Sequence, residues 1–130
     1  MVNIVIVSHS HLLAEGLKQM ASEMCADAVK ILSAGGLDES TLGTNAEKIL
    51  KAIQEAYTDD GVIVFFDLGG ALFNAQMAIE MLPVEQRDKV RICGAPVVEG
   101  TLVAAVESSL GKTLDEVQSA AEACRLTKKC

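Results

Sequence analysis

The chain has 130 residues, of which half are hydrophobic and only 3% are aromatic, with no tryptophan. This length allows one domain with a substantial hydrophobic core, and we expect a single domain over residues 1–130. The formal net charge of −7 disfavours nucleic-acid binding, because no basic stripe is present to meet the phosphates.

Membrane, disulfide and metal readings are also disfavoured. The N-terminal apolar run has no basic flank of the kind a leader needs, and the longest later run, 62–66, is too short to cross a bilayer. The four cysteines lack CxxC or CxxH spacing, and His9-Ser10-His11 has no third ligand at a suitable spacing. We therefore expect a cytoplasmic protein with reduced thiols and no metal.

The chain begins with a strand that leads into a helix. Residues 2–7 form a short β-branched run, which is typical of a buried strand. Helical spacing follows from about residue 10 to residue 25. Its larger apolar residues recur at helical intervals and are predicted to form the stripe that faces the core. The stripe consists of Leu13, Leu17, Met20 and Met24.

Alternating strands and helices follow to the end of the chain. Residues 29–34 predict a second strand, and after a loop at 37–43 a helix opens at Thr44, which with Glu47 fits a capping box. The continuous apolar run 62–66 predicts a central strand. The remaining expected elements are a helix at 71–82, a strand at 89–93, a helix at 98–110, a last helix at 113–124 that opens with a Thr113–Glu116 capping box, and a frayed tail at 126–130.

The order β-α-β-α-β-α-β-α-α predicts an α/β fold, a doubly wound and mostly parallel four-stranded sheet flanked by helices. Right-handed crossovers bring the carboxyl ends of all strands to one edge of the sheet. If the strand order is 2-1-3-4, the first and third strands flank the switch point. His9 and Asp67 then face the same crevice.

His9 and Asp67 are the strongest candidates for chemistry. A carboxylate that accepts a hydrogen bond from Nδ1–H leaves Nε2 of the imidazole unprotonated, as a nucleophile. Two plainer readings remain open, in which His9 only hydrogen-bonds in the turn and Asp67 caps the following helix. Gly69-Gly70 before a helix suits a phosphoryl group, although such a pair is more often a tight turn.

Four segments resemble the mannose-class enzyme IIA domains of the phosphotransferase system, and more closely the branch that serves bacterial dihydroxyacetone kinase. They are residues 1–10, 43–46, 66–72 and 93–102, so the resemblance covers nearly the whole chain in order. It implies that His9 is phosphorylated and that Asp67 orients it. The residues expected to bind the phosphoryl group are Ser10, Gly43, Thr44, Gly69, Gly70 and Ala71.

The resemblance also implies partners. A cytoplasmic homodimer would accept a phosphoryl group from HPr and pass it to ADP on the subunit DhaL, with dihydroxyacetone on DhaK and no cofactor on this chain. Some relatives carry fused HPr-like and enzyme I-like domains, which these 130 residues do not include.

Two alternative functions remain, a sugar-uptake IIA component that passes phosphate to a IIB domain and a non-catalytic regulatory module. The helical pattern at 113–124 favours the dihydroxyacetone branch, because sugar-uptake members have an exchanged strand in that region.

Overall fold

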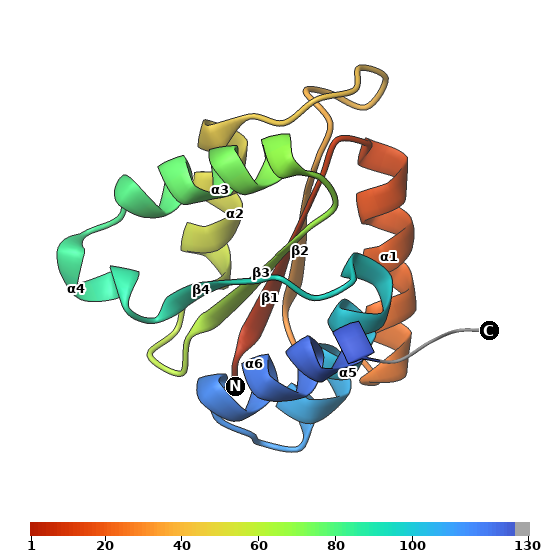
Figure 1. Ribbon diagram of the computed structural model, residues 1–130, viewed down its shortest axis with the longest axis vertical. Helices are drawn as coiled ribbons and strands as arrows, with labels where there is room; N and C mark the ends of the chain where they lie inside the picture. The colour runs from red at the N-terminus through yellow and green to blue at the C-terminus, as the bar shows by residue number, and fades with distance from the viewer. Residues whose placement is uncertain (127–130) are drawn as a thin grey trace.

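Four short β-branched runs form one parallel sheet in the order β2-β1-β3-β4, which confirms the predicted fold class and strand order (Figure 1). The computed structural model describes residues 1–126, so the predicted frayed tail lies, apart from Leu126, outside the described residues. The strands are β1 (Asn3–Ser8), β2 (Ile31–Gly35), β3 (Val62–Phe66) and β4 (Val90–Cys93).

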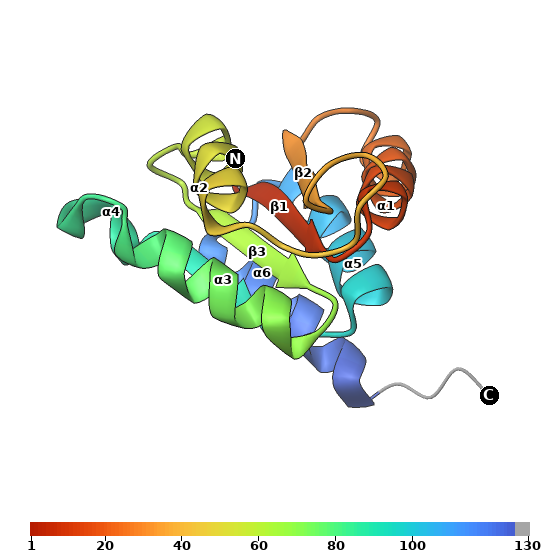
Figure 2. The ribbon, with the colours of Figure 1, turned by 90° about the horizontal axis from the view of Figure 1, so that it is seen from above.

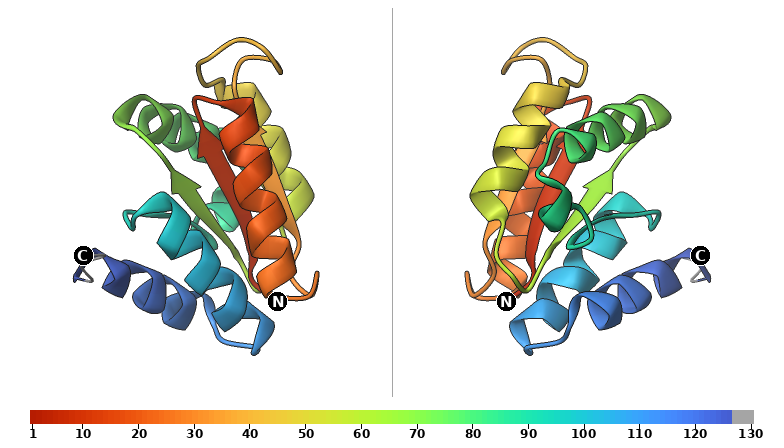
Figure 3. Two further views of the ribbon diagram at one scale, coloured as in Figure 1. Left: turned by 90° about the vertical axis from the view of Figure 1, so that its right-hand side faces the viewer. Right: turned by 90° about the vertical axis from the view of Figure 1, so that its left-hand side faces the viewer.

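Helices cover both faces of the sheet. Alternate residues of β1 supply the two cores, since Ile4 and Ile6 pack on the side of α1, α5 and α6, whereas Val5 and Val7 pack on the side of α2 and α3. Figures 2 and 3 show α1 and α2 on opposite sides of β1 and β2. The helices are α1 (His11–Met24), α2 (Ala46–Ala56), α3 (Gly69–Glu80), α4 (Val84–Arg87), α5 (Val97–Ser109), α6 (Leu114–Glu122) and the 3₁₀ helix η1 (Ala123–Leu126).

The register of β1 and β3 positions the site. Val7 lies opposite Phe66, so the residues that follow both strands emerge side by side at the carboxyl edge of the sheet. Ser8 is fully buried at the end of β1, and α1 begins three residues later. The segment Ser8–Ser10 and the segment beginning at Asp67 therefore meet where the central strands end.

The predicted core stripe of α1 is wrong for three of its four residues. Leu17 is buried, but Leu13 is exposed, and Met20 and Met24 are 52% and 58% exposed. The stripe that packs on the sheet is formed by Ala14, Leu17 and Ala21. The small alanines let the helix approach the sheet closely, and the longer methionines lie outside the contact.

The start of α2 also differs from the prediction. Its N-cap is Asn45, whose side-chain oxygen accepts a hydrogen bond from the Lys48 N–H at 3.1 Å. The expected Thr44–Glu47 capping box is therefore wrong, because the Thr44 hydroxyl instead accepts a hydrogen bond from the Asn74 side chain. The Thr113–Glu116 capping box before α6 is confirmed.

Two smaller differences concern the segment after β3. Helix α3 begins at Gly69, two residues earlier than predicted, so the Gly69-Gly70 pair belongs to its first turn. The four-residue helix α4 was not predicted, because a single turn is too short to show helical periodicity.

The corrected α1 stripe predicts unequal effects of two truncations. Leu17→Ala should lower the free energy of unfolding by about 3 kcal/mol, because it leaves a cavity against the sheet. Met20→Ala, the matched control on the same helix, should change it by less than about 1 kcal/mol. Urea denaturation measures both values, and equal losses would show that Met20 lies in the core after all.

Candidate functional site

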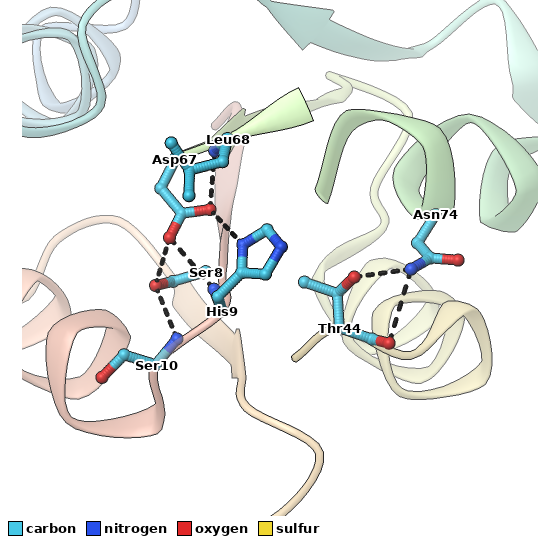
Figure 4. A network of polar contacts seen from close by, with 7 residues as sticks. All are labelled: Ser8, His9, Ser10, Thr44, Asp67, Leu68 and Asn74. Carbon is cyan, nitrogen blue, oxygen red and sulfur yellow. Dashed lines mark hydrogen bonds and ion pairs between the residues drawn. The ribbon is translucent and has the colours of Figure 1, made fainter. Parts of the chain in front are cut away.

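The carboxylate of Asp67 joins the ends of β1 and β3 (Figure 4). Its Oδ1 lies 3.0 Å from Nδ1 of His9 and accepts the Leu68 N–H at 2.7 Å. Its Oδ2 accepts the Ser8 hydroxyl at 2.8 Å and the His9 backbone N–H at 3.0 Å. Both oxygens are thus fixed in place, and the His9 ring is fixed with them.

These contacts keep Asp67 ionised. Partial burial raises the pKa of the carboxyl, but the hydrogen bonds from His9, Ser8 and Leu68 outweigh it and hold the pKa below its ordinary value of 3.8. A lowered pKa means that the carboxylate contributes stability above pH 3.8. That contribution is lost as the pH falls through the lower folded-state value.

An ionised carboxylate accepts hydrogen bonds and cannot donate them. The Nδ1 atom of His9 therefore carries the proton of the hydrogen bond to Asp67, and Nε2 of the neutral ring keeps its lone pair. The His9 side chain is 31% exposed, whereas that of Asp67 is 13% exposed. The imidazole is thus partly accessible to solvent, whereas the carboxylate that is hydrogen-bonded to its Nδ1 is largely covered.

The first turn of α3 lies against Nε2. A Cβ atom added at Gly70 would be 3.1 Å from Nε2, whereas one added at Gly69 would meet nothing within 4 Å. Within residues 1–126, nothing accepts a hydrogen bond from the N–H groups of these two glycines, which lie at the start of the helix. Such groups and the positive end of the helix dipole favour an anion beside Nε2.

Two of the residues predicted to bind the phosphoryl group already use their backbone N–H groups in hydrogen bonds within the chain. The Gly43 N–H donates to the His9 carbonyl at 2.8 Å, and its φ of +136° explains why a glycine stands there. Ala71 is buried, and its N–H donates to the Leu68 carbonyl at 3.0 Å. These two residues therefore hold the backbone of the site and offer no N–H to a ligand.

The two predicted hydroxyl groups have structural partners. The Ser10 side chain caps α1 by accepting the Leu13 N–H at 3.2 Å. The Thr44 oxygen accepts the Asn74 side-chain N–H at 2.5 Å, which ties the segment before α2 to α3 (Figure 4). Each hydroxyl keeps its own hydrogen for donation to a ligand.

Two residues of the site were missed by the sequence analysis. Ser8 is the fully buried end of β1, and its oxygen also accepts the Ser10 N–H at 3.0 Å. The signal for Ser8 was a polar residue that ends a buried strand. Asn74 follows Gly70 by four residues and so lies on the same side of α3, a relation that helical spacing alone would have shown.

The described part of the chain has neither a metal-binding cluster nor a helix that could span a membrane. Residues 1–126 contain no group of three or more His, Cys, Asp or Glu side chains placed to hold a metal ion. No helix in this range combines the length and the apolar character that crossing a bilayer requires.

The chain matches a known protein family over most of its length. The family EIIA-man, described as the PTS system fructose IIA component, matches residues 3–118. The chain therefore belongs to the mannose-class enzyme IIA family of the phosphotransferase system. A crystal structure of a protein of unknown function has the same fold, with a TM-score of 0.82 and 31% identity over 94% of both chains.

Its curated relatives are DhaM subunits. The chain is 45% identical over 120 residues to the phosphoryl donor subunit DhaM of the PEP-dependent dihydroxyacetone kinase of Escherichia coli, a match that covers 90% of this chain and 25% of the relative. It is 39% identical to the DhaM of dihydroxyacetone kinase 2 of Listeria innocua, which covers 90% of this chain and 94% of the relative. The chain thus spans a quarter of one relative and nearly all of the other.

The contact between α3 and His9 predicts different effects of alanine at two adjacent glycines. Gly70→Ala should slow phosphorylation of His9 by roughly tenfold or more, which corresponds to about 1.4 kcal/mol, because the new methyl group lies against Nε2. Gly69→Ala is the control, since its methyl group enters open space. Mass spectrometry after incubation with phosphoramidate follows the reaction, and equal rates for the two variants would contradict the steric argument.

Proposed function

We propose that this chain is a phosphohistidine carrier, which accepts a phosphoryl group from HPr on Nε2 of His9 and passes it to ADP bound on DhaL. The ATP so formed would phosphorylate dihydroxyacetone on DhaK. One observation carries the proposal: Asp67 holds Nδ1 of His9 at 3.0 Å, which leaves Nε2 beside the first turn of α3. The reaction needs no cofactor or metal on this chain, and Mg²⁺ would accompany the nucleotide on the partner.

The proposed reaction consists of two displacements at phosphorus. In the first, the lone pair of Nε2 forms a bond to phosphorus while the bond between phosphorus and the histidine nitrogen of HPr breaks. In the second, a terminal phosphate oxygen of ADP attacks, and the bond between phosphorus and Nε2 breaks. Transfers of this kind depend on positioning and charge stabilisation more than on covalent assistance.

The residues around His9 suit both steps. Phosphorylation of Nε2 places positive charge on a ring that keeps its proton on Nδ1, and the Asp67 carboxylate at 3.0 Å stabilises that charge. The N–H groups of Gly69 and Gly70 would bind the phosphoryl oxygens. Ser10 and Thr44 would each contribute a hydroxyl hydrogen from the rim of the site.

The relatives support this function over the alternatives. Both DhaM relatives described above are named as phosphoryl donor subunits of dihydroxyacetone kinases, and the Listeria relative has nearly the same length as this chain. Residues 114–122 form helix α6, in the region where sugar-uptake members have an exchanged strand. The description of the family as a fructose IIA component would also fit the sugar-uptake alternative. The identity of the protein that accepts the phosphoryl group distinguishes the two functions.

We further propose that the chain acts as a cytoplasmic homodimer. Support comes from the side of α1 that does not face the sheet, where Met20 and Met24 are exposed. Together with Leu102 of α5 they line a shallow groove. A second copy of the chain would cover this apolar surface, which we call the α1–α5 groove.

Replacing Asp67 tests its role as the orienting group. Asp67→Asn keeps the size of the side chain but leaves one acceptor oxygen in place of the two carboxylate oxygens that now accept from four donors. If the side-chain NH2 of the asparagine faces the ring, it donates a hydrogen bond to Nδ1. The ring then carries its proton on Nε2, which is no longer a nucleophile. We expect phosphoryl transfer to fall roughly 10²-fold or more, as measured by quenched-flow kinetics.

Asp59→Asn is the control for that experiment, because Asp59 is an exposed residue of the turn before β3. It should transfer at the wild-type rate. If folded Asp67→Asn also transfers at that rate, Asp67 has a structural role only.

The fate of the phosphoryl group tests the proposed function itself. Protein phosphorylated with enzyme I, HPr and phosphoenolpyruvate should lose its label to ADP-loaded DhaL and produce bound ATP. Free ADP should be a poor acceptor, because this chain has no nucleotide-binding loop of its own. His9→Ala should take up no label. Transfer to a IIB domain and not to DhaL would support the sugar-uptake alternative, and label that is never passed on would support a regulatory module.

A further inference from the structure

Helix α3 is built with its small side chains inward and its large apolar side chains outward. Ala71, Ala75 and Ala78 are fully buried against the sheet. Phe73 is 63% exposed, and Leu68 and Met77 are exposed as well. We call the surface formed by Leu68, Phe73 and Met77 the α3 apolar face.

The surroundings of this face in the sequence are uncharged. No Asp, Glu, Lys or Arg occurs between Asp67 and Glu80, although the chain contains 18 acidic and 11 basic residues. Surface helices ordinarily present charged side chains to water, whereas the outward side of α3 carries none before Glu80, the last residue of the helix. Phe73 and Met77 are four residues apart and so are neighbours on the helix surface, and exposed apolar surface of this kind marks a site of protein–protein contact.

The α3 apolar face adjoins the reactive nitrogen. Phe73 follows Gly70 by three residues, which places both on one side of the helix, and Gly70 is the residue whose added Cβ would lie 3.1 Å from Nε2. Leu68 follows Asp67 directly and lies beside the His9–Asp67 pair (Figure 4). Any protein that covers this face therefore has part of its surface next to Nε2.

We propose that the α3 apolar face docks the subunit that receives the phosphoryl group, through an apolar surface beside its bound nucleoside diphosphate. This inference rests on the proposed function. The acceptor atom must approach the phosphorus bonded to Nε2 closely, so the receiving protein has to cover the adjoining first turns of α3. An uncharged surface suits this encounter, because acidic side chains there would repel the anionic nucleotide.

A second copy of this chain is a poorer occupant of the same face. A permanent subunit contact at Phe73 and Leu68 would cover Nε2 and hinder phosphoryl exchange. The α1–α5 groove supplies a separate apolar surface, which lies on the opposite side of the sheet from α3. The α3 apolar face is therefore left for a transient partner.

The experiment compares two aspartate substitutions at equally exposed apolar residues. Phe73→Asp lies in the α3 apolar face. Leu110→Asp, at a site 67% exposed after α5, follows Ser108, whose hydroxyl donates to the Val2 carbonyl just before β1, so it lies near the amino ends of the strands and far from Nε2. The readout is steady-state ATP formation with increasing concentrations of the ADP-loaded receiving subunit. Phe73→Asp should raise KM for that subunit by roughly tenfold or more, with kcat within about twofold. Leu110→Asp should change neither value.

Two further measurements keep the outcomes distinct. Labelling of His9 by phosphoramidate should be the same in the wild type and in Phe73→Asp, which shows that the substitution leaves the folded site intact. Analytical ultracentrifugation should give both proteins the same mass. An unchanged KM in Phe73→Asp overturns the docking proposal alone, and a lowered mass with unchanged KM assigns the face to a second copy. If the wild-type phosphoprotein transfers nothing to the receiving subunit, the proposed function fails together with this inference.

Discussion

The Asp67 carboxylate is the contact on which the site depends. It accepts hydrogen bonds from a buried hydroxyl, two backbone N–H groups and an imidazole, all at the carboxyl ends of the two central strands. The loop after β1 and the turn after β3 are thus joined by one charged group. Because four donors converge on two oxygens, the carboxylate stays ionised, and the tautomer of His9 follows from that ionisation.

The proximity of His9 and Asp67 could be predicted from the sequence, because it follows from topology once the strand order 2-1-3-4 is assumed. Buried parallel strands are recognisable as continuous apolar runs, and the order 2-1-3-4 places His9 and Asp67 at one switch point. The plainer reading of Asp67 as a helix cap is not supported, since α3 has Leu68 at its N-cap position and no side-chain cap bond. The contacts of Ser8 with Asp67 and of Gly70 with Nε2 could be found only from the structure, because a sequence pattern does not specify interatomic distances.

Where the prediction failed, tertiary contacts chose between local alternatives that the sequence leaves nearly equal. Two helical stripes on α1 have suitable spacing, and the one with alanines packs on the sheet because it allows closer approach. Thr44 and Asn45 are adjacent and both can cap a helix. The hydrogen bond from Asn74 occupies the Thr44 hydroxyl, so Asn45 becomes the cap. Neither decision is encoded within a few residues of the position concerned.

The glycine pair at the start of α3 has a consequence for how this site tolerates mutation. The groups that we propose to bind the phosphoryl oxygens there are main-chain N–H groups, and among the twenty amino acids only proline removes such a group. No polar side chain has to be retained at these two positions. What selection must preserve is the small size of residue 70, whereas at residue 69 larger side chains have room. In this part of the site, substitutions are therefore limited mainly by the size of the side chain at position 70.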